Sequence, residues 1–355
     1  MSLLLPPLRP TFEAALRDVG ARDPRSRVAA AEVLADAEEG SKEEACAGLR
    51  KLAEDEVAEV RISALVGLGR QRDTAALELV LARFADGDPT VREVAILAAG
   101  DIGDARAEPA IKKALTDARP EVRFQAIGAL LALSKDDARV HLLARLRDDD
   151  AKVRAQAAAA LSTLPSEPKT TDALARLLDD ADRGARLEAA LALADLKDSR
   201  AIPVLRAVGL SDDTRMIDAI VALADVHATE AIEDLAKIAT AFLKHLMIKA
   251  AAAASLVRLG DPRGVRVLRD VLRAFRADGR TYAVVCVGEL ALLELEDEIV
   301  RLSERPRGAD PVAVARTLAR LSEAGSAPAK KALERMAERD DEAAEFAREA
   351  LAPRP

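Results

Sequence analysis

The sequence predicts an all-α fold, a right-handed superhelix (α-solenoid) of about eleven helix pairs, and three observations support it. A short pattern that ends in Val-Arg recurs at a nearly fixed interval. An aspartate precedes most copies, and apolar residues at helical spacing follow them. Aromatic residues make up only 2% of the 355 residues, although 50% are hydrophobic. This composition suits closely packed helices with a core of Ala, Leu, Val and Ile.

The recurring pattern defines the length of the repeat. The closing arginines Arg61, Arg92, Arg123 and Arg154 are 31 residues apart, and Arg186 follows 32 residues later. A period in this range is typical of stacked helix pairs rather than of one globular core. Each pair is then expected to contact mainly its two neighbours.

One unit, residues 74–104, shows how the pattern maps onto helices. Apolar residues at helical spacing between Leu77 and Phe84 predict a first helix. Asp-Gly-Asp-Pro at 86–89 predicts a turn, because proline suits the first position of a new helix. A second helix is expected from Val91 to about Gly100. The same reading places units near 9–38, 42–72, 74–104, 106–136, 137–167, 169–198, 199–228, 229–260, 262–296, 297–324 and 326–352.

We expect one solenoid over residues 1–355, with four segments of different regularity. They are an N-terminal capping segment (1–22), regular repeats (23–198), irregular and longer repeats (199–296), and C-terminal repeats with a polar cap (297–355). The regularity ends after Lys197, where the expected aspartate is replaced by Gly209, six residues before Arg215. Irregular units often mark a binding face. Sequence drift without a function explains these units equally well, because packing against the neighbouring units tolerates it.

The spacing of charged residues connects the repeat to a known family. An aspartate stands six residues before each closing arginine, and an alanine stands three residues after it. Together with the Val-Arg pattern, this resembles HEAT repeats, in the short form also found in phycobilisome-lyase-type proteins. The resemblance implies that these charges form a hydrogen-bonded ladder between repeats; a phosphate-binding stripe is the alternative. We call them the Asp–Arg ladder: Asp55, Asp86, Asp117, Asp148 and Asp180 with Arg61, Arg92, Arg123, Arg154 and Arg186.

A candidate binding groove follows from the expected position of the second helices on the concave side. The residues one and five positions after each arginine should face this groove, and most of them are apolar or small. If exposed, they form a trough for an amphipathic helix or an extended peptide; alternatively, tight curvature lets adjacent helices cover them. The predicted partner-binding residues are Val28, Ile62, Val66, Glu93, Leu97, Phe124, Leu187 and Leu191.

A second candidate surface is a basic stripe. Arg266, Arg269, Arg273, Arg276 and Arg280 are spaced to share one helix face. The stripe could receive an acidic segment, a phosphorylated loop or RNA, or it could be a solvated face with ion pairs inside the chain. The net charge of −8 and the lack of interleaved aromatic residues argue against nucleic acid.

No catalytic pattern accompanies the repeats. The sequence has no nucleotide-binding, zinc-protease or serine-hydrolase motif. His141, His227 and His245 lack metal-ligand spacing, and the distant Cys46 and Cys286 suggest buried thiols in a reducing compartment. The N-terminus resembles neither a signal peptide nor a membrane span. We therefore expect a cytoplasmic, bacterial-type protein that is not an enzyme and needs no cofactor or metal.

These observations predict a non-catalytic scaffold or adaptor that binds a protein partner through the groove, with residues 199–296 as a second contact or hinge. The partner would supply a helix or an extended segment, which could include an acidic part. The resemblance to lyase-type repeats implies one alternative, a lyase- or chaperone-like factor for a modified or chromophore-bearing protein. Nucleic-acid binding through the basic stripe is the less favoured alternative.

Overall fold

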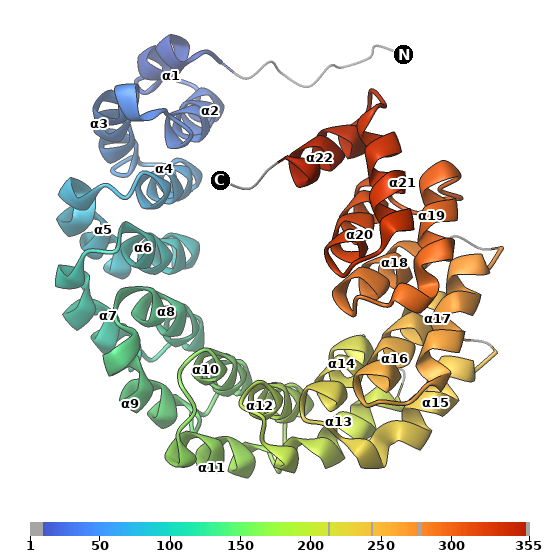
Figure 1. The fold of residues 1–355 in the computed structure, drawn as a ribbon. Helices are drawn as coiled ribbons and strands as arrows, with labels where there is room; N and C mark the ends of the chain where they lie inside the picture. Colours follow the sequence, from blue (N-terminus) through green and yellow to red (C-terminus); the bar gives the residue numbers. More distant parts are fainter. Residues whose placement is uncertain (1–9, 212–213, 243, 276–278, 353–355) are drawn as a thin grey trace, which may run out of the picture. The chain divides into compact units, whose positions relative to one another are not determined.

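The computed structural model describes residues 10–211, 214–242, 244–275 and 279–352. Every regular element within these ranges is helical, and 22 α-helices follow one another as eleven pairs (Figure 1). The predicted all-α solenoid of helix pairs is therefore confirmed. None of the helices in these ranges is long and apolar enough to cross a membrane.

The chain divides into two compact units, Met1–Ala189 and Ala190–Pro355. The helices of unit 1 are α1 (Phe12–Asp18), α2 (Pro24–Ala35), α3 (Lys42–Leu52), α4 (Ala58–Arg70), α5 (Leu77–Ala82), α6 (Pro89–Ile102), α7 (Glu108–Ala114), α8 (Pro120–Leu133), α9 (Lys135–Arg145), α10 (Ala151–Ser162) and α11 (Pro168–Leu177). Helix α12 (Arg183–Asp195) contains the boundary between the units. One continuous solenoid over the whole chain stays a prediction.

The helices of unit 2 complete the list. They are α13 (Ile202–Gly209), α14 (Met216–Asp225), α15 (Ile232–Thr240), α16 (Leu246–Arg258), α17 (Arg263–Arg273), α18 (Arg280–Glu289), α19 (Glu296–Glu304), α20 (Pro311–Glu323), α21 (Ala327–Ala337) and α22 (Glu342–Leu351). The second helices α14, α16, α18, α20 and α22 pack against one another in chain order.

The second helices begin where the sequence pattern predicts. The Asp88 carboxylate accepts hydrogen bonds from the backbone N–H groups of Thr90 and Val91, at 2.8 and 3.1 Å, and Pro89 occupies the first helical position. Asp150 caps α10 in the same way. These caps satisfy backbone donors that the helix leaves free, so they fix the starts of α6 and α10.

Small residues bring the second helices of unit 1 close together. Helices α2, α4, α6, α8 and α10 pack in sequence and lie on the inner side of this unit, with the first helices outside them (Figure 1). Ala64, Ala95 and Ala126 are fully buried at equivalent positions. A Cβ atom on Gly100 of α6 would lie 2.9 Å from the Cα of Ala129 on α8. A larger side chain there would force the two helices apart.

Candidate binding surfaces

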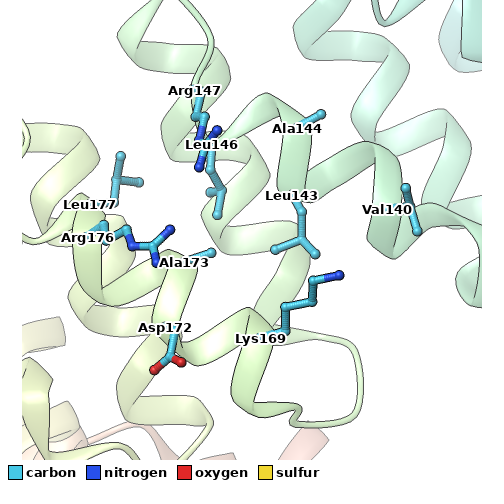
Figure 2. Close-up of a pocket in the computed structure, with 10 residues that line it drawn as sticks. All are labelled: Val140, Leu143, Ala144, Leu146, Arg147, Lys169, Asp172, Ala173, Arg176 and Leu177. Carbon is cyan, nitrogen blue, oxygen red and sulfur yellow. The ribbon is translucent and has the colours of Figure 1, made fainter.

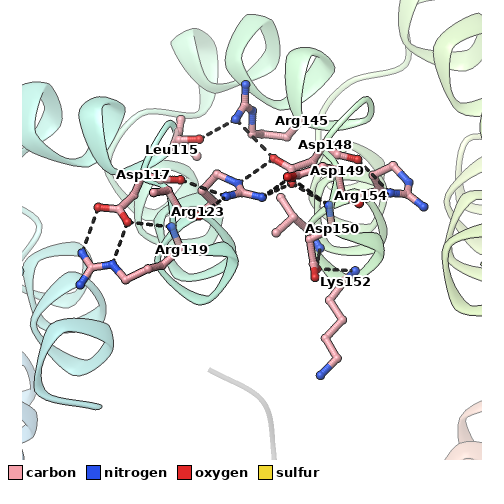
Figure 3. Close-up of polar contacts among 12 residues, drawn as sticks. Leu115, Asp117, Arg119, Arg123, Arg145, Asp148, Asp149, Asp150, Lys152 and Arg154 are labelled. Carbon is pink, nitrogen blue, oxygen red and sulfur yellow. Dashed lines mark hydrogen bonds and ion pairs between the residues drawn. The ribbon is translucent and has the colours of Figure 1, made fainter. Parts of the chain in front are cut away.

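The Asp–Arg ladder joins successive repeats of unit 1. Arg61 donates two hydrogen bonds to the Asp86 carboxylate, at 2.7 and 3.0 Å, and its Nη1 donates to the carbonyl of Asp55 at 2.7 Å. Arg123 and Arg154 bind the carboxylates of the following repeats in the same way. Figure 3 shows Arg123 between its own turn and the next. The structural role implied by the family resemblance is confirmed for these arginines.

The ladder is interrupted at one position. The Asp117 carboxylate accepts from Arg119, at 2.8 and 3.0 Å, instead of from Arg92 (Figure 3). Arg92 binds carbonyls of its own turn, and its buried Nε has no hydrogen-bond partner among the described residues. The expected Arg92–Asp117 bond is therefore wrong. Arg119 stands where other units carry a capping aspartate, such as Asp88 or Asp150, and it captures the carboxylate.

The ladder carboxylates are held in their charged form. The hydrogen bond from Arg154 lowers the pKa of Asp180, against the effect of burial. Burial raises the pKa of Asp86, but the hydrogen bonds from Arg61 and from the backbone N–H of Asp88, together with the nearby arginine charges, outweigh it, so this pKa is also lowered. The charges of Arg61, Arg123 and Arg154 are thus neutralised by carboxylates inside the turns, which argues against a phosphate-binding stripe.

The predicted groove residues of α4, α6 and α8 form an apolar surface. Val66 on α4 and Leu97 on α6 are 40% and 41% exposed, and Ile62, Glu93 and Phe124 are half-buried. Since α4 contacts α6 and α6 contacts α8, these side chains belong to one face. We call Ile62, Val66, Leu97 and Phe124 the apolar row.

The other predicted groove residues contribute less. Val28 on α2 is half-buried, and so is Leu191, which lies beyond the boundary of unit 1. Leu187 is only 4% exposed. It is a buried residue and offers no surface to a partner, which corrects the expectation for this position.

A hollow of about 320 Å³ opens beside the apolar row. Its lining residues come from α6, α8, α10 and the turn before α10: Glu93, Pro120, Glu121, Phe124, Gln125, Asp150 and Lys152. Phe124 supplies the large apolar wall, and three carboxylates face one lysine. One turn further along α8, a Cβ atom on Gly128 would meet nothing within 4 Å, so the surface is open there.

The sequence analysis missed a larger hollow on the other face of unit 1. It has a volume of about 650 Å³ and lies between α9 and α11 (Figure 2). Its lining residues are Val140, Leu143, Ala144, Leu146, Arg147, Lys169, Asp172, Ala173, Arg176 and Leu177. Val140 is 73% exposed although it is large and apolar. The sequence did contain a signal for this surface, because Val140 lies between Arg139 and His141, outside the apolar stripe of the helix.

The predicted basic stripe is not one helix face. Helix α17 ends at Arg273 and α18 begins at Arg280, while Arg276 lies outside the described residues. Arg266 is exposed. Arg269 and Arg273 both form ion pairs with Glu298, which is 5% exposed.

Arg280 has a different role from the one predicted. It is 1% exposed. Its Nε donates to the carbonyl of Leu272 at 3.1 Å, and its Nη1 and Nη2 donate to the carbonyls of Arg307 and Ala274. The guanidinium group of Arg280 donates hydrogen bonds to three carbonyl groups and therefore points into the protein. Arg280 therefore acts like a ladder arginine and is not part of an exposed basic stripe.

The repeats match a known family. The profile of HEAT repeats matches residues 10–96, 77–162 and 139–221, which together span more than half of the chain. The chain belongs to the HEAT-repeat family. No curated protein matches it.

Solved structures with similar folds include the E. coli protein YibA and importin beta. The YibA chain has 18% identity and a TM-score of 0.52, with 71% of this chain and 93% of YibA covered. Importin beta has 13% identity and a TM-score of 0.50, with 96% of this chain and 52% of importin beta covered. At these identities the likeness concerns the fold alone.

The two cysteines of this HEAT-repeat protein are core residues. Cys46 and Cys286 are 2% and 4% exposed. Burial raises the pKa of the Cys286 thiol to about 12, so the thiol stays protonated at neutral pH and is a poor nucleophile. Burial also raises the pKa of Cys46. The described residues contain no cluster of three or more His, Cys, Asp or Glu side chains suited to a metal ion.

Proposed function

We propose that this HEAT-repeat protein is a non-catalytic adaptor that binds a protein partner along the second helices of unit 1. The observation that carries the proposal is the apolar row. Val66 and Leu97 are each about two-fifths exposed on adjacent helices. Apolar side chains that line up over several elements mark interaction surfaces more often than isolated ones do.

The hollow beside Phe124 indicates the chemistry of the partner. An apolar side chain of the partner would pack against Phe124, and a helix or an extended segment would continue over Leu97 and Val66. Glu93, Glu121 and Asp150 outnumber Lys152 around the hollow. A partner with a basic residue next to its apolar anchor fits this charge best.

Affinity capture from a native lysate tests the proposal. The bait is wild-type protein or the double variant Leu97→Asp/Phe124→Asp, and captured proteins are identified by mass spectrometry. Both side chains are partly exposed, so circular dichroism should show unchanged helicity. We expect at least one protein to be captured by wild type and lost with the variant. Equal capture by both baits would refute a binding site on the apolar row.

Two further variants separate the possible sites. Gly128→Met adds bulk without charge at an open position, so it should reduce capture without destabilising α8. Val140→Asp places a charge in the hollow between α9 and α11 and should leave capture unchanged. Loss of capture with Val140→Asp alone would move the binding site to that hollow.

A further inference from the structure

Unit 2 carries a second surface, at the turns that join first helices to second helices. Leu210, Phe242 and Phe275 occupy three successive turns of this kind and are 52%, 94% and 104% exposed. In unit 1 the corresponding turns carry ladder aspartates such as Asp86 and Asp148. The chain has only six phenylalanines, and two of them are presented to solvent here.

Gly279, which follows the turn of Phe275, packs against the start of α16, the helix that follows the turn of Phe242. It has a φ of +85°, which favours glycine. A Cβ atom there would lie 2.4 Å from the backbone nitrogen of Met247 and 2.6 Å from the carbonyl carbon of Leu246. The backbone at Gly279 therefore lies against the first residues of α16, a few positions after Phe242.

Arg280 ties the same turn to the next one. Its guanidinium binds the carbonyl of Ala274, which directly precedes Phe275, and the carbonyl of Arg307 in the turn after α19. Since one buried side chain binds both carbonyls, the backbone beside Phe275 and the backbone at Arg307 lie close together on one edge of unit 2. The apolar turns thus continue into a basic one.

The basic end of this edge is a hollow of about 550 Å³. Its lining residues are Leu272, Arg273, Glu298, Arg301, Leu302, Glu304, Arg305 and Arg307. We call it the arginine hollow. Its volume lies within the roughly 300–1,000 Å³ range of ligand pockets.

Positive charge is in excess in the arginine hollow. Glu298 is neutralised by Arg269 and Arg273, and Glu304 pairs with Arg335, which lies outside the hollow, at 3.0 Å. Arg301, Arg305 and Arg307 are exposed and form no ion pair with any residue that the structure describes. Three guanidinium groups around one hollow are a match for closely spaced carboxylates.

We propose that this edge of unit 2 binds an acidic peptide segment of a partner protein. Carboxylates of the segment enter the arginine hollow, and an apolar side chain next to them packs on Phe275, with Phe242 one turn further. A single strand of nucleic acid would need cations along the whole row of stacking side chains. Here the unpaired arginines gather at one end, which fits a segment with charge at one end and apolar residues at the other.

The test is selection from a random peptide display library on the full-length protein. We expect enrichment of peptides that combine Asp or Glu runs with Phe, Leu or Ile. A fluorescent version of the most enriched peptide should bind more weakly as the salt concentration rises. Phe275→Ser should weaken its binding about tenfold, the order expected for losing one buried aromatic contact.

The decisive variant is Arg301→Gln/Arg305→Gln/Arg307→Asn, which should abolish binding of the enriched peptides. Asparagine is chosen for Arg307 because that residue has a φ of +50° and asparagine tolerates this conformation. The matched control, Arg22→Gln/Arg25→Gln/Arg72→Asn, makes the same charge change at exposed sites of unit 1, and Arg72 also has a φ of +50°. It should bind as wild type does.

The outcomes distinguish this surface from the groove of unit 1. Leu97→Asp/Phe124→Asp should leave peptide binding intact, because the two surfaces have no residue in common. Enrichment without acidic residues, or equal binding by the triple variant, would overturn the proposal. So would binding of a single-stranded oligonucleotide that the triple variant loses while no acidic peptide is enriched.

Discussion

Removing one ladder carboxylate should destabilise unit 1 far more than removing an exposed one. The Asp148 side chain is 2% exposed and accepts from Arg123 at 2.9 and 2.5 Å, and it also accepts from the backbone N–H of Asp150 at 3.1 Å. Asp148→Asn keeps the size and the turn geometry but removes the charge. Arg123, whose side chain is 7% exposed, would then lose its buried counter-charge.

The expected cost follows from the burial of the pair. Removing one partner of a buried ion pair costs about 3–5 kcal/mol. Arg123 would retain Asp149 and the carbonyls of its own turn, so we expect the lower end, about 3 kcal/mol. The control is Asp36→Asn, because the side chains of Asp36 and Arg70 are 52% and 60% exposed. An exposed pair contributes about 0–1 kcal/mol.

Urea unfolding followed by circular dichroism measures both variants. Repeat arrays can unfold in parts, so hydrogen exchange of the α8 and α10 amides should locate the loss for Asp148→Asn. If Asp148→Asn cost no more than Asp36→Asn, the ladder would not be a source of stability and the reasoning would fail.

Three other predictions concern unit 1. Gly100→Ala should lower stability by about 1–3 kcal/mol, because the new Cβ atom would meet the α8 backbone. Gly128→Ala should raise stability by about 1 kcal/mol, because that position is open. Equal urea midpoints for the two variants would contradict this prediction. Arg119→Asp should raise stability by about 1 kcal/mol by capping α8 and releasing Asp117, and a lower melting temperature would count against it. Folding lowers the pKa of the ladder carboxylates Asp86, Asp148 and Asp180 below the ordinary value of 3.8. Their contribution to stability is therefore complete at a pH above 3.8, and it is lost as the pH falls through the lowered pKa values. Acid titration by circular dichroism should therefore show helix loss below pH 3.8, and Asp148→Asn should flatten that loss.

Much of the fold could be predicted from the sequence because its rules are local and repeated. The Asp-x5-Arg spacing returns from Asp55–Arg61 to Asp180–Arg186 together with the apolar helical stripe, and several of these units also carry a capping aspartate. A departure at one position therefore does not change the number of helix pairs, although it can break a single bond of the ladder, as Arg119 does at Asp117. The apolar row was predictable for the same reason, since Val66 and Leu97 occupy equivalent positions in consecutive units.

The candidate sites depended more on packing. Leu187 and Ile62 occupy the same position in their repeats, directly after a ladder arginine, yet Leu187 is buried and Ile62 is not. The hollow between α9 and α11 is formed by two helices of different repeats, so no single motif encodes it.

The sequence alone determined that this chain is a stack of helix pairs tied by aspartates and arginines, because periodicity and capping act within one repeat. Only the tertiary structure decided which charges remain available to a partner. Arg119 and Arg92 compete for one carboxylate, and Arg280 turns inward to three carbonyl groups. Arg301, Arg305 and Arg307 surround a hollow without acidic partners among the described residues. Such outcomes depend on distances between repeats, which residue spacing along the chain does not specify.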